Sequence, residues 1–230
     1  MAEITANIQV APGIFRMSVA GAYAGKMGQF YMLRAWDKTP LLSRPISIYS
    51  LDAEEIHFLY QVVGEGTRIL SMLQAGDEIT LEGPFGNGFP ELNGKVALVG
   101  GGIGIAPFYY ALQSLPQADV YLGFSQKPYE VDHFKRITDR VTVNVGGHIL
   151  DLVDYEAYDA IFVCGPNAMM QAAQRLNERW SGRNKVYVSL ENRMACGVGA
   201  CLVCSVGTTG GRKKSCVDGP VFAVEEVKSW

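Results

Sequence analysis

Four of the chain's five cysteines lie close together toward its C-terminal end, at Cys196, Cys201, Cys204 and Cys216. The first three have the Cys-x4-Cys-x2-Cys spacing with which plant-type proteins hold a [2Fe–2S] cluster, and a fourth cysteine follows further along. Such a cluster transfers single electrons. The spacing therefore predicts a redox protein in which these four thiolates are the iron ligands.

The residues between the cysteines suit a loop that wraps around a cluster. Gly197 and Gly199 can take positive φ without steric cost, so backbone N–H groups can be aimed at sulfur. Zinc stays open as an alternative, although structural zinc sites usually pair two short cysteine knuckles and Cys216 stands alone. Disulfides also stay open. The odd number of cysteines and an N-terminal sequence that is neither basic nor a long apolar run argue against an oxidising compartment and predict a cytoplasmic protein.

A glycine-rich string suited to phosphate binding follows a predicted buried strand, Lys95–Val99, and precedes a predicted helix, Phe108–Ser114. Glycines let a phosphate approach the backbone, and a helix N-terminus offers free N–H groups. This placement favours a dinucleotide site, although Pro107 stands where the usual fingerprint has its third glycine. A tight turn without a ligand is the alternative. The glycines concerned are Gly100, Gly101, Gly102 and Gly104.

Three other strings contain groups that suit a flavin or a nucleotide. In Arg44-Pro45-Ile46-Ser47, the guanidinium can pair with phosphate and the hydroxyl can bond a ring nitrogen, although the string alone is an ordinary strand. Gly66-Thr67, after Leu59-Tyr60-Gln61, places a glycine and a hydroxyl at a predicted helix start, which suits a pyrophosphate. Cys164-Gly165-Pro166 ends an apolar strand, where ligands collect, with a buried structural thiol as the alternative for Cys164.

The composition is that of a globular protein. The chain has 230 residues, of which 48% are hydrophobic and 19% charged, which suggests one or two domains and an appendage. No apolar stretch approaches the roughly 18 residues of a membrane-spanning helix. The net charge of −3 argues against a nucleic-acid or anionic-membrane partner. Arg212-Lys213-Lys214 is interpreted as a solvated loop tip, and the three histidines match no ligand spacing.

Residues 1–92 are predicted to form an antiparallel β-barrel. Short apolar stretches separated by Gly, Pro and Asp turns are typical of small barrels of this kind. One helix, Gly66–Leu73, is predicted to interrupt the strands. The predicted strands are Ile4–Val10, Phe15–Val19, Gln29–Leu33, Ile56–Val63 and Glu78–Leu81.

Residues 93–190 are predicted to form a doubly wound parallel sheet, because strands there alternate with helices. Lys95–Val99 is a continuous apolar run, as expected for a strand buried on both faces. The other predicted elements are the strands Asp119–Phe124, Val141–Val145, Ala160–Cys164 and Lys185–Leu190 and the helices Phe108–Ser114 and Ala168–Trp180. Residues 191–230, which hold the cysteine segment, are predicted to be a small C-terminal domain. The predicted fold class is therefore β plus α/β.

Taken together, the strings RPISI, LYQVVGEGT, GPFGNGF, GGGIGIAP, CGP and ENRMACGVGACLVC resemble the ferredoxin-reductase-like flavoproteins. Their order is most similar to that in the electron-transfer subunits of class 1B dihydroorotate dehydrogenase, over nearly the whole chain. This resemblance implies an FAD-binding β-barrel, an NAD-binding α/β domain and a [2Fe–2S] cluster domain.

The resemblance also implies which residues bind the cofactors. The diphosphate of FAD would lie at Gly66 and Thr67. Family members often have an arginine where this chain has Gln61, and the change removes a cation from the pyrophosphate clamp. NAD rather than NADP is taken from the resemblance alone. The implied FAD contacts are Arg44, Pro45, Ile46, Ser47, Leu59, Tyr60 and Gln61; the implied NAD contacts are Gly100, Gly101, Gly102, Gly104, Cys164, Gly165 and Pro166; the implied iron ligands are Cys196, Cys201, Cys204 and Cys216.

The implied function is electron transfer from a partner. A flavin can accept single electrons and exchange a hydride, so FAD must stand between the cluster and NAD⁺. The resemblance names the partner as a catalytic, FMN-containing dihydroorotate dehydrogenase subunit of pyrimidine biosynthesis, in a heterotetramer of two of each. Two alternatives stay open: a reductase subunit that serves ferredoxin, sulfide or another acceptor, and a non-catalytic zinc-binding module.

Overall fold

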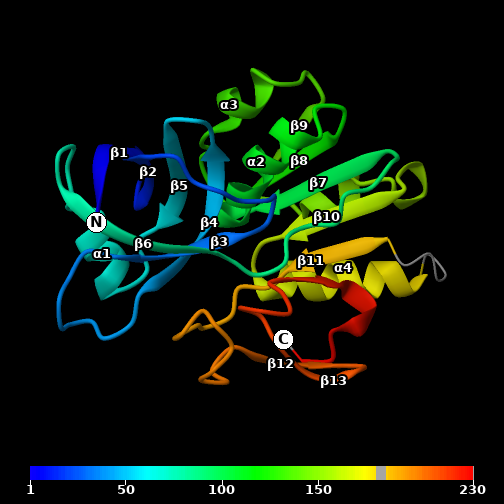
Figure 1. Cartoon of the computed structure of the whole chain (residues 1–230). Coiled ribbons are helices and arrows are strands. Elements are labelled where there is room, and N and C mark those ends of the chain that lie inside the picture. The colour runs from blue at the N-terminus through cyan, green and yellow to red at the C-terminus, as the bar shows by residue number, and fades with distance from the viewer. Residues whose placement is uncertain (180–184, 230) are drawn as a thin grey trace.

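The computed structural model describes residues 1–179 and 185–229. A closed barrel packs beside an open sheet, and the C-terminal segment lies below both of them in the view of Figure 1. Within the described residues, no helix has the length and apolar character needed to cross a membrane.

The N-terminal barrel has six antiparallel strands in the order β1-β2-β5-β4-β3-β6. The predicted strands are confirmed, and the Arg44 string forms a further strand, β4. β6 runs past its predicted end to Phe85, because its pairing with β3 resumes at Phe85, opposite Phe30, after an irregularity at Gly83 and Pro84. The bounds are β1 Ala2–Ala11, β2 Ile14–Ala20, β3 Phe30–Arg34, β4 Arg44–Leu51, β5 Glu55–Gln61, α1 Glu65–Leu70 and β6 Glu78–Phe85.

The second unit is a six-stranded sheet in the order β14-β11-β10-β7-β8-β9, parallel except for β14. Strands β8, β9 and β10 match their predicted bounds. The helix α3 was not predicted, and Trp180, the last residue of the predicted final helix, lies outside the described residues. The bounds are β7 Val96–Gly101, α2 Ala106–Ser114, β8 Asp119–Phe124, α3 Val131–Lys135, β9 Val141–Val145, β10 Ala160–Cys164, α4 Asn167–Arg179, β11 Val186–Ser189 and β14 Val221–Ala223, with 3-10 turns at Gly102–Ile105, Ile149–Leu152, Tyr155–Ala157 and Val224–Glu226.

Helices cover both faces of this sheet. Along β7, Val96 and Leu98 pack in the same apolar cluster as Phe108 of α2, while Ala97 and Val99 pack with Met170 of α4. A strand covered on both faces has no polar side, which explains its continuous apolar run. The doubly wound prediction is therefore confirmed.

The strand order reverses direction between β7 and β10. From β7 the chain continues to β8 and β9 on one side, and β10 and β11 lie on the other. Cys164, at the end of β10, pairs with Gly100, near the end of β7. Ligands of open α/β sheets bind in the crevice at such a reversal, so the fold places two of the predicted strings at the expected ligand edge.

The C-terminal segment adds a hairpin, β12 Ser205–Thr208 and β13 Gly211–Lys214, and returns to the main sheet through β14. The interpretation of the basic string as a solvated loop tip was wrong. Lys213 Nζ lies 2.6 Å from Glu226, and Lys214 Nζ donates to the Gly199 carbonyl at 3.2 Å. These partners are distant in sequence, so the charge run alone did not indicate them. The domain boundaries at 92/93 and 190/191 stay predictions.

A partly buried ion pair joins the barrel to the sheet unit. Arg16 of β2 donates at 2.7 Å to Glu130, whose side chain is 5% exposed and whose φ of 58° is left-handed. The Tyr49 hydroxyl of β4 donates to the same carboxylate oxygen at 2.8 Å. The His133 ring lies 3.3 Å from it, and burial lowers the pKa of this histidine. The carboxylate thus fixes the two units against each other.

Replacing Glu130 with Ala is expected to lower the free energy of unfolding by about 3 kcal/mol, because a charged Arg16 and the Tyr49 hydroxyl lose their shared acceptor in a buried place. Urea denaturation measures the change. Glu91→Ala is the matched control, because Glu91 is 84% exposed and only 4.0 Å from Lys26. That variant should stay within about 0.5 kcal/mol of the parent. Equal stabilities for the two variants would contradict the joining role of Glu130.

Candidate cofactor site

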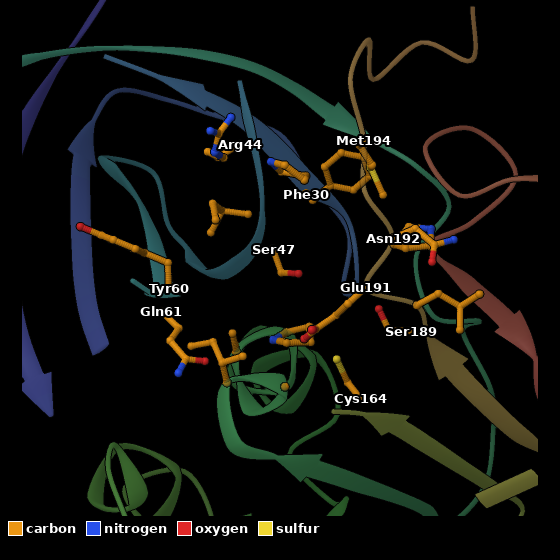
Figure 2. A pocket seen from close by; sticks show the side chains of 18 of the residues that line it. Phe30, Arg44, Ser47, Tyr60, Gln61, Cys164, Ser189, Glu191, Asn192 and Met194 are labelled. Atoms are coloured by element: carbon orange, nitrogen blue, oxygen red, sulfur yellow. The ribbon is translucent and has the colours of Figure 1, made fainter. Parts of the chain in front are cut away.

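A cavity of about 370 Å³ lies between the barrel and the sheet. Figure 2 shows side chains from both units around it, with Gln61 from the barrel on one side and Cys164 and Ser189 from the strand ends on the other. The Tyr60 ring points away from the cavity, and its hydroxyl donates to Asn7 at 3.0 Å. The cavity therefore opens at the edge where the strand order reverses. The predicted residues that line it are Arg44, Pro45, Ile46, Ser47, Leu59, Tyr60, Gln61, Thr67, Gly104 and Cys164.

The remaining predicted nucleotide residues lie beside the cavity and do not line it. All of them except Gly66 lie close to Gly104, which does line the cavity. A Cβ at Gly104 would come within 2.4 Å of the Cys164 carbonyl oxygen, so glycine lets the turns after β7 and β10 touch. Gly66 lies beneath Arg44, where a Cβ would meet the guanidinium Nε at 2.4 Å. The residues outside the lining are Gly66, Gly100, Gly101, Gly102, Gly165 and Pro166.

Arg44 supplies positive charge to the barrel wall. Its guanidinium lies over Gly66 near the start of α1 and stacks 5.4 Å from the Trp36 ring. The Thr67 hydroxyl accepts the Val63 N–H at 3.0 Å and donates to the Gly64 carbonyl at 3.0 Å, which holds the turn before α1. A cation and a closed turn thus meet on one side of the cavity.

On the sheet side, the cavity wall carries two groups that hold their protons to higher pH than usual. Burial, with Glu191 nearby, raises the pKa of the Cys164 thiol. Partial burial also raises the pKa of the Glu191 carboxyl, a residue that lines the cavity and keeps an exposed surface. Sequence reasoning missed Glu191, because a single carboxylate before the cysteine segment matches no motif. Ser189, at the end of β11, lies beside Cys164 in Figure 2.

The four clustered cysteines form two pairs. The Cys201 N–H donates to Cys196 Sγ at 3.4 Å, and the sulfurs of Cys204 and Cys216 lie 3.3 Å apart. Backbone hydrogen bonds, first from Cys201, lower the pKa of Cys196 to about 6. Burial raises the pKa of Cys216 to about 11.

Two observations on this segment fit a two-iron cluster. The positive φ expected for Gly197 and Gly199 is confirmed, at 72° and 77°. The four thiols lie in two close pairs, Cys196 with Cys201 and Cys204 with Cys216. A [2Fe–2S] core takes two thiolates at each iron, so this pairing fits such a core.

An apolar cluster connects these cysteines to the cavity. Cys204 and Cys216 pack with Phe30 and Met194, among others. Phe30 and Met194 also line the cavity, and both are visible at its edge in Figure 2. The buried cysteine pair and the cavity thus share one apolar cluster.

Comparison with known proteins agrees with this site. Residues 191–228 match the model of the iron-sulfur cluster binding domain of dihydroorotate dehydrogenase B. The chain is 44% identical to the electron transfer subunit of dihydroorotate dehydrogenase B (NAD(+)) from Clostridium acetobutylicum, over 98% of this chain and 95% of that protein. Identity to the subunit of the same name from Clostridium perfringens is 38%, over 98% and 96%. The chain belongs to this family.

The solved structures that are similar to this chain include reductases. A structure of an NADH-dependent reduced ferredoxin-NADP oxidoreductase, described for flavin-based electron bifurcation, covers 99% of this chain and 90% of its own, with a TM-score of 0.88 and 30% identity. A ferredoxin NADP+ reductase from Neisseria gonorrhoeae, covering 84% and 93%, has a TM-score of 0.61 and 18% identity, which shows the fold alone. The predicted family and fold class are confirmed.

Proposed function

We propose that this chain passes electrons from the FMN of a partner dihydroorotate dehydrogenase, through a [2Fe–2S] cluster and FAD, to NAD⁺ in pyrimidine biosynthesis. The observation that carries the proposal is the shared wall of the two sites. Phe30 and Met194 belong to the apolar cluster that holds the buried pair Cys204 and Cys216, and both also line the cavity. Electron transfer between two cofactors needs such a short separation.

The proposed binding residues fall into three sets, one each for FAD, NAD and the [2Fe–2S] cluster. Bound FAD would convert between one-electron and hydride transfer. Arg44 supplies charge for its diphosphate, and Gly66 leaves room for that guanidinium. Glu191, with its raised pKa, can hold a proton at the cavity wall. The proposed FAD residues are Arg44, Pro45, Ile46, Ser47, Leu59, Tyr60, Gln61, Gly66 and Thr67; the proposed NAD residues are Gly100, Gly101, Gly102, Gly104, Cys164, Gly165 and Pro166; the proposed iron ligands are the four clustered cysteines.

An exposed apolar patch beside the cysteines suits the docking of the partner. Val198, Leu202, Val203 and Val217 are 61%, 63%, 54% and 43% exposed. Cys201 itself is exposed, so this edge of the cluster would face the partner. Contiguous exposed apolar side chains mark interaction sites. We expect a heterotetramer of two chains of each kind.

The decisive experiment mixes the purified chain, loaded with FAD and iron, with a purified FMN-containing dihydroorotate dehydrogenase subunit. NADH formation that depends on dihydroorotate and on both proteins is the expected result. Each protein alone is the control. A chain that carries FAD and an iron–sulfur cluster but gives no NADH with any such partner would contradict this function.

A second function is favoured by the likeness to the ferredoxin-NADP oxidoreductase, because it covers nearly the whole chain at 30% identity. In that case, the chain would exchange electrons with ferredoxin instead of a dihydroorotate-oxidising partner. The higher identity, 44%, to a dihydroorotate dehydrogenase B subunit places this function second. NADH-dependent reduction of ferredoxin, without activity in the mixed assay, would reverse the order.

A further inference from the structure

Lys214 is in contact with the cluster-binding loop. It ends β13, and its Nζ donates at 3.2 Å to the carbonyl oxygen of Gly199, which lies between Cys196 and Cys201. The Gly199 carbonyl and the Ala200 N–H belong to one peptide group. That N–H is the last of the backbone groups that lower the pKa of Cys196, and the Cys201 N–H, which donates to this sulfur at 3.4 Å, is the first. The lysine therefore binds the carbonyl end of a peptide in the loop that surrounds Cys196, a proposed iron ligand.

This arrangement forms a short hydrogen-bonded relay. A cation at the carbonyl end of a peptide polarises the N–H at its other end, because hydrogen bonds in a chain strengthen one another. The relay withdraws electron density from Cys196 Sγ, and hydrogen bonds to the ligand sulfurs help to set the potential of a cluster. Among the described residues, the lysines in ion pairs are Lys26, Lys95 and Lys213, so Lys214 Nζ forms no ion pair there. The Asp218 carboxylate accepts the backbone N–H of Lys214 at 2.6 Å and is not paired with its Nζ.

We propose that Lys214 is a positioning residue that raises the reduction potential of the [2Fe–2S] cluster, through its charge and through the Gly199–Ala200 peptide. The inference depends on the proposed function, since it needs the cluster to bind. Reduction adds one electron to a centre already made negative by four thiolates, and no bond is broken. A nearby positive charge favours the reduced state. The effect would ease electron entry from the partner.

The neighbouring Lys213 provides a matched control. It lies one position earlier in the same strand, where side chains point to the opposite face. Its Nζ is paired with Glu226 at 2.6 Å, and it makes no contact with the cysteine loop among the described residues. Both variants remove one lysine charge from the same hairpin, and only one of the two touches Gly199.

The test is a redox titration of the purified full-length chain, followed by the EPR signal of the reduced cluster. Lys214→Met is expected to lower the equilibrium constant for cluster reduction about tenfold, which is about 59 mV for a one-electron couple. Lys214→Arg should stay close to the parent because the charge and the donor remain. Lys214→Gln should show an intermediate shift, since it keeps a donor without the charge. Lys213→Met should leave the potential unchanged.

Unchanged potentials in Lys214→Met and Lys214→Gln, with the cluster intact, would overturn the inference. Equal shifts in Lys214→Met and Lys213→Met would also overturn it, because the effect would then be a general one of net charge. Failure of both Lys214→Met and Lys214→Gln to retain iron would show a role in assembly instead. A parent chain without any iron–sulfur signal would contradict the proposed function itself, which is a separate outcome.

Discussion

Replacing Cys201 with Ser is expected to remove the visible bands and the EPR signal of the iron–sulfur cluster. The serine oxygen is a poor substitute for a thiolate toward iron. Dihydroorotate-dependent NADH formation should fall by at least about a hundredfold. Reduction of FAD by NADH should persist, because Cys201 is exposed and does not line the cavity. Stopped-flow absorbance of each step measures the difference.

Cys164→Ser is the control for metal content. It also removes one thiol, but Cys164 lies at the end of β10 and is not part of the cysteine pairs. Its iron and sulfide content should equal that of the parent, whereas Cys201→Ser should have lost both. Equal loss of the partner-driven reaction and of FAD reduction by NADH in Cys201→Ser would show that the C-terminal segment is structural for the flavin site.

Local sequence patterns were sufficient to predict most of the fold. The unbroken apolar run before Gly100 indicated a strand buried on both faces, and the structure confirms it with α2 and α4 on either side. Turn residues between short apolar stretches predicted the barrel. Both predictions succeeded because the burial of a strand's faces leaves a pattern in its own local sequence. The proposed iron ligands around Cys196 could be predicted because they are close to one another in sequence.

Contacts between distant segments were not predictable in this way. The partners Arg16 and Glu130 are 114 residues apart, and no local period relates them. β14, at Val221–Ala223, is too short to show a period of its own, and its place in the sheet depends on pairing with β11. Glu191 and Lys214 acquire their surroundings only when the C-terminal segment folds back. Glu191 and Lys214 are ionisable groups of the proposed cofactor sites, so this part of the sites was not predictable from the sequence.

Replacing Arg44 with Met is expected to weaken FAD binding. Its guanidinium lies at the turn before α1, and Gln61, on the same wall, is uncharged. Loss of a charge-assisted hydrogen bond to phosphate costs about 1.5–3 kcal/mol, which corresponds to roughly ten- to a hundredfold in Kd. Titration of the deflavinated chain with FAD measures it. Arg34→Met is the matched control, because Arg34 lies 5.9 Å from the same Trp36 ring but is not among the described residues that line the cavity.

Adding a cation at residue 61 tests whether Gln61 weakens the binding of the FAD pyrophosphate. Gln61→Arg would place a second cation on the wall that Arg44 occupies, at a residue that lines the cavity. We expect tighter FAD binding in the parent and a larger gain in the Arg44→Met background, because a lone arginine can then pair with the unneutralised diphosphate. Equal Kd values for the parent, Arg44→Met and Gln61→Arg would show that the FAD diphosphate does not lie at this wall. The cavity would then have to hold the flavin in another orientation.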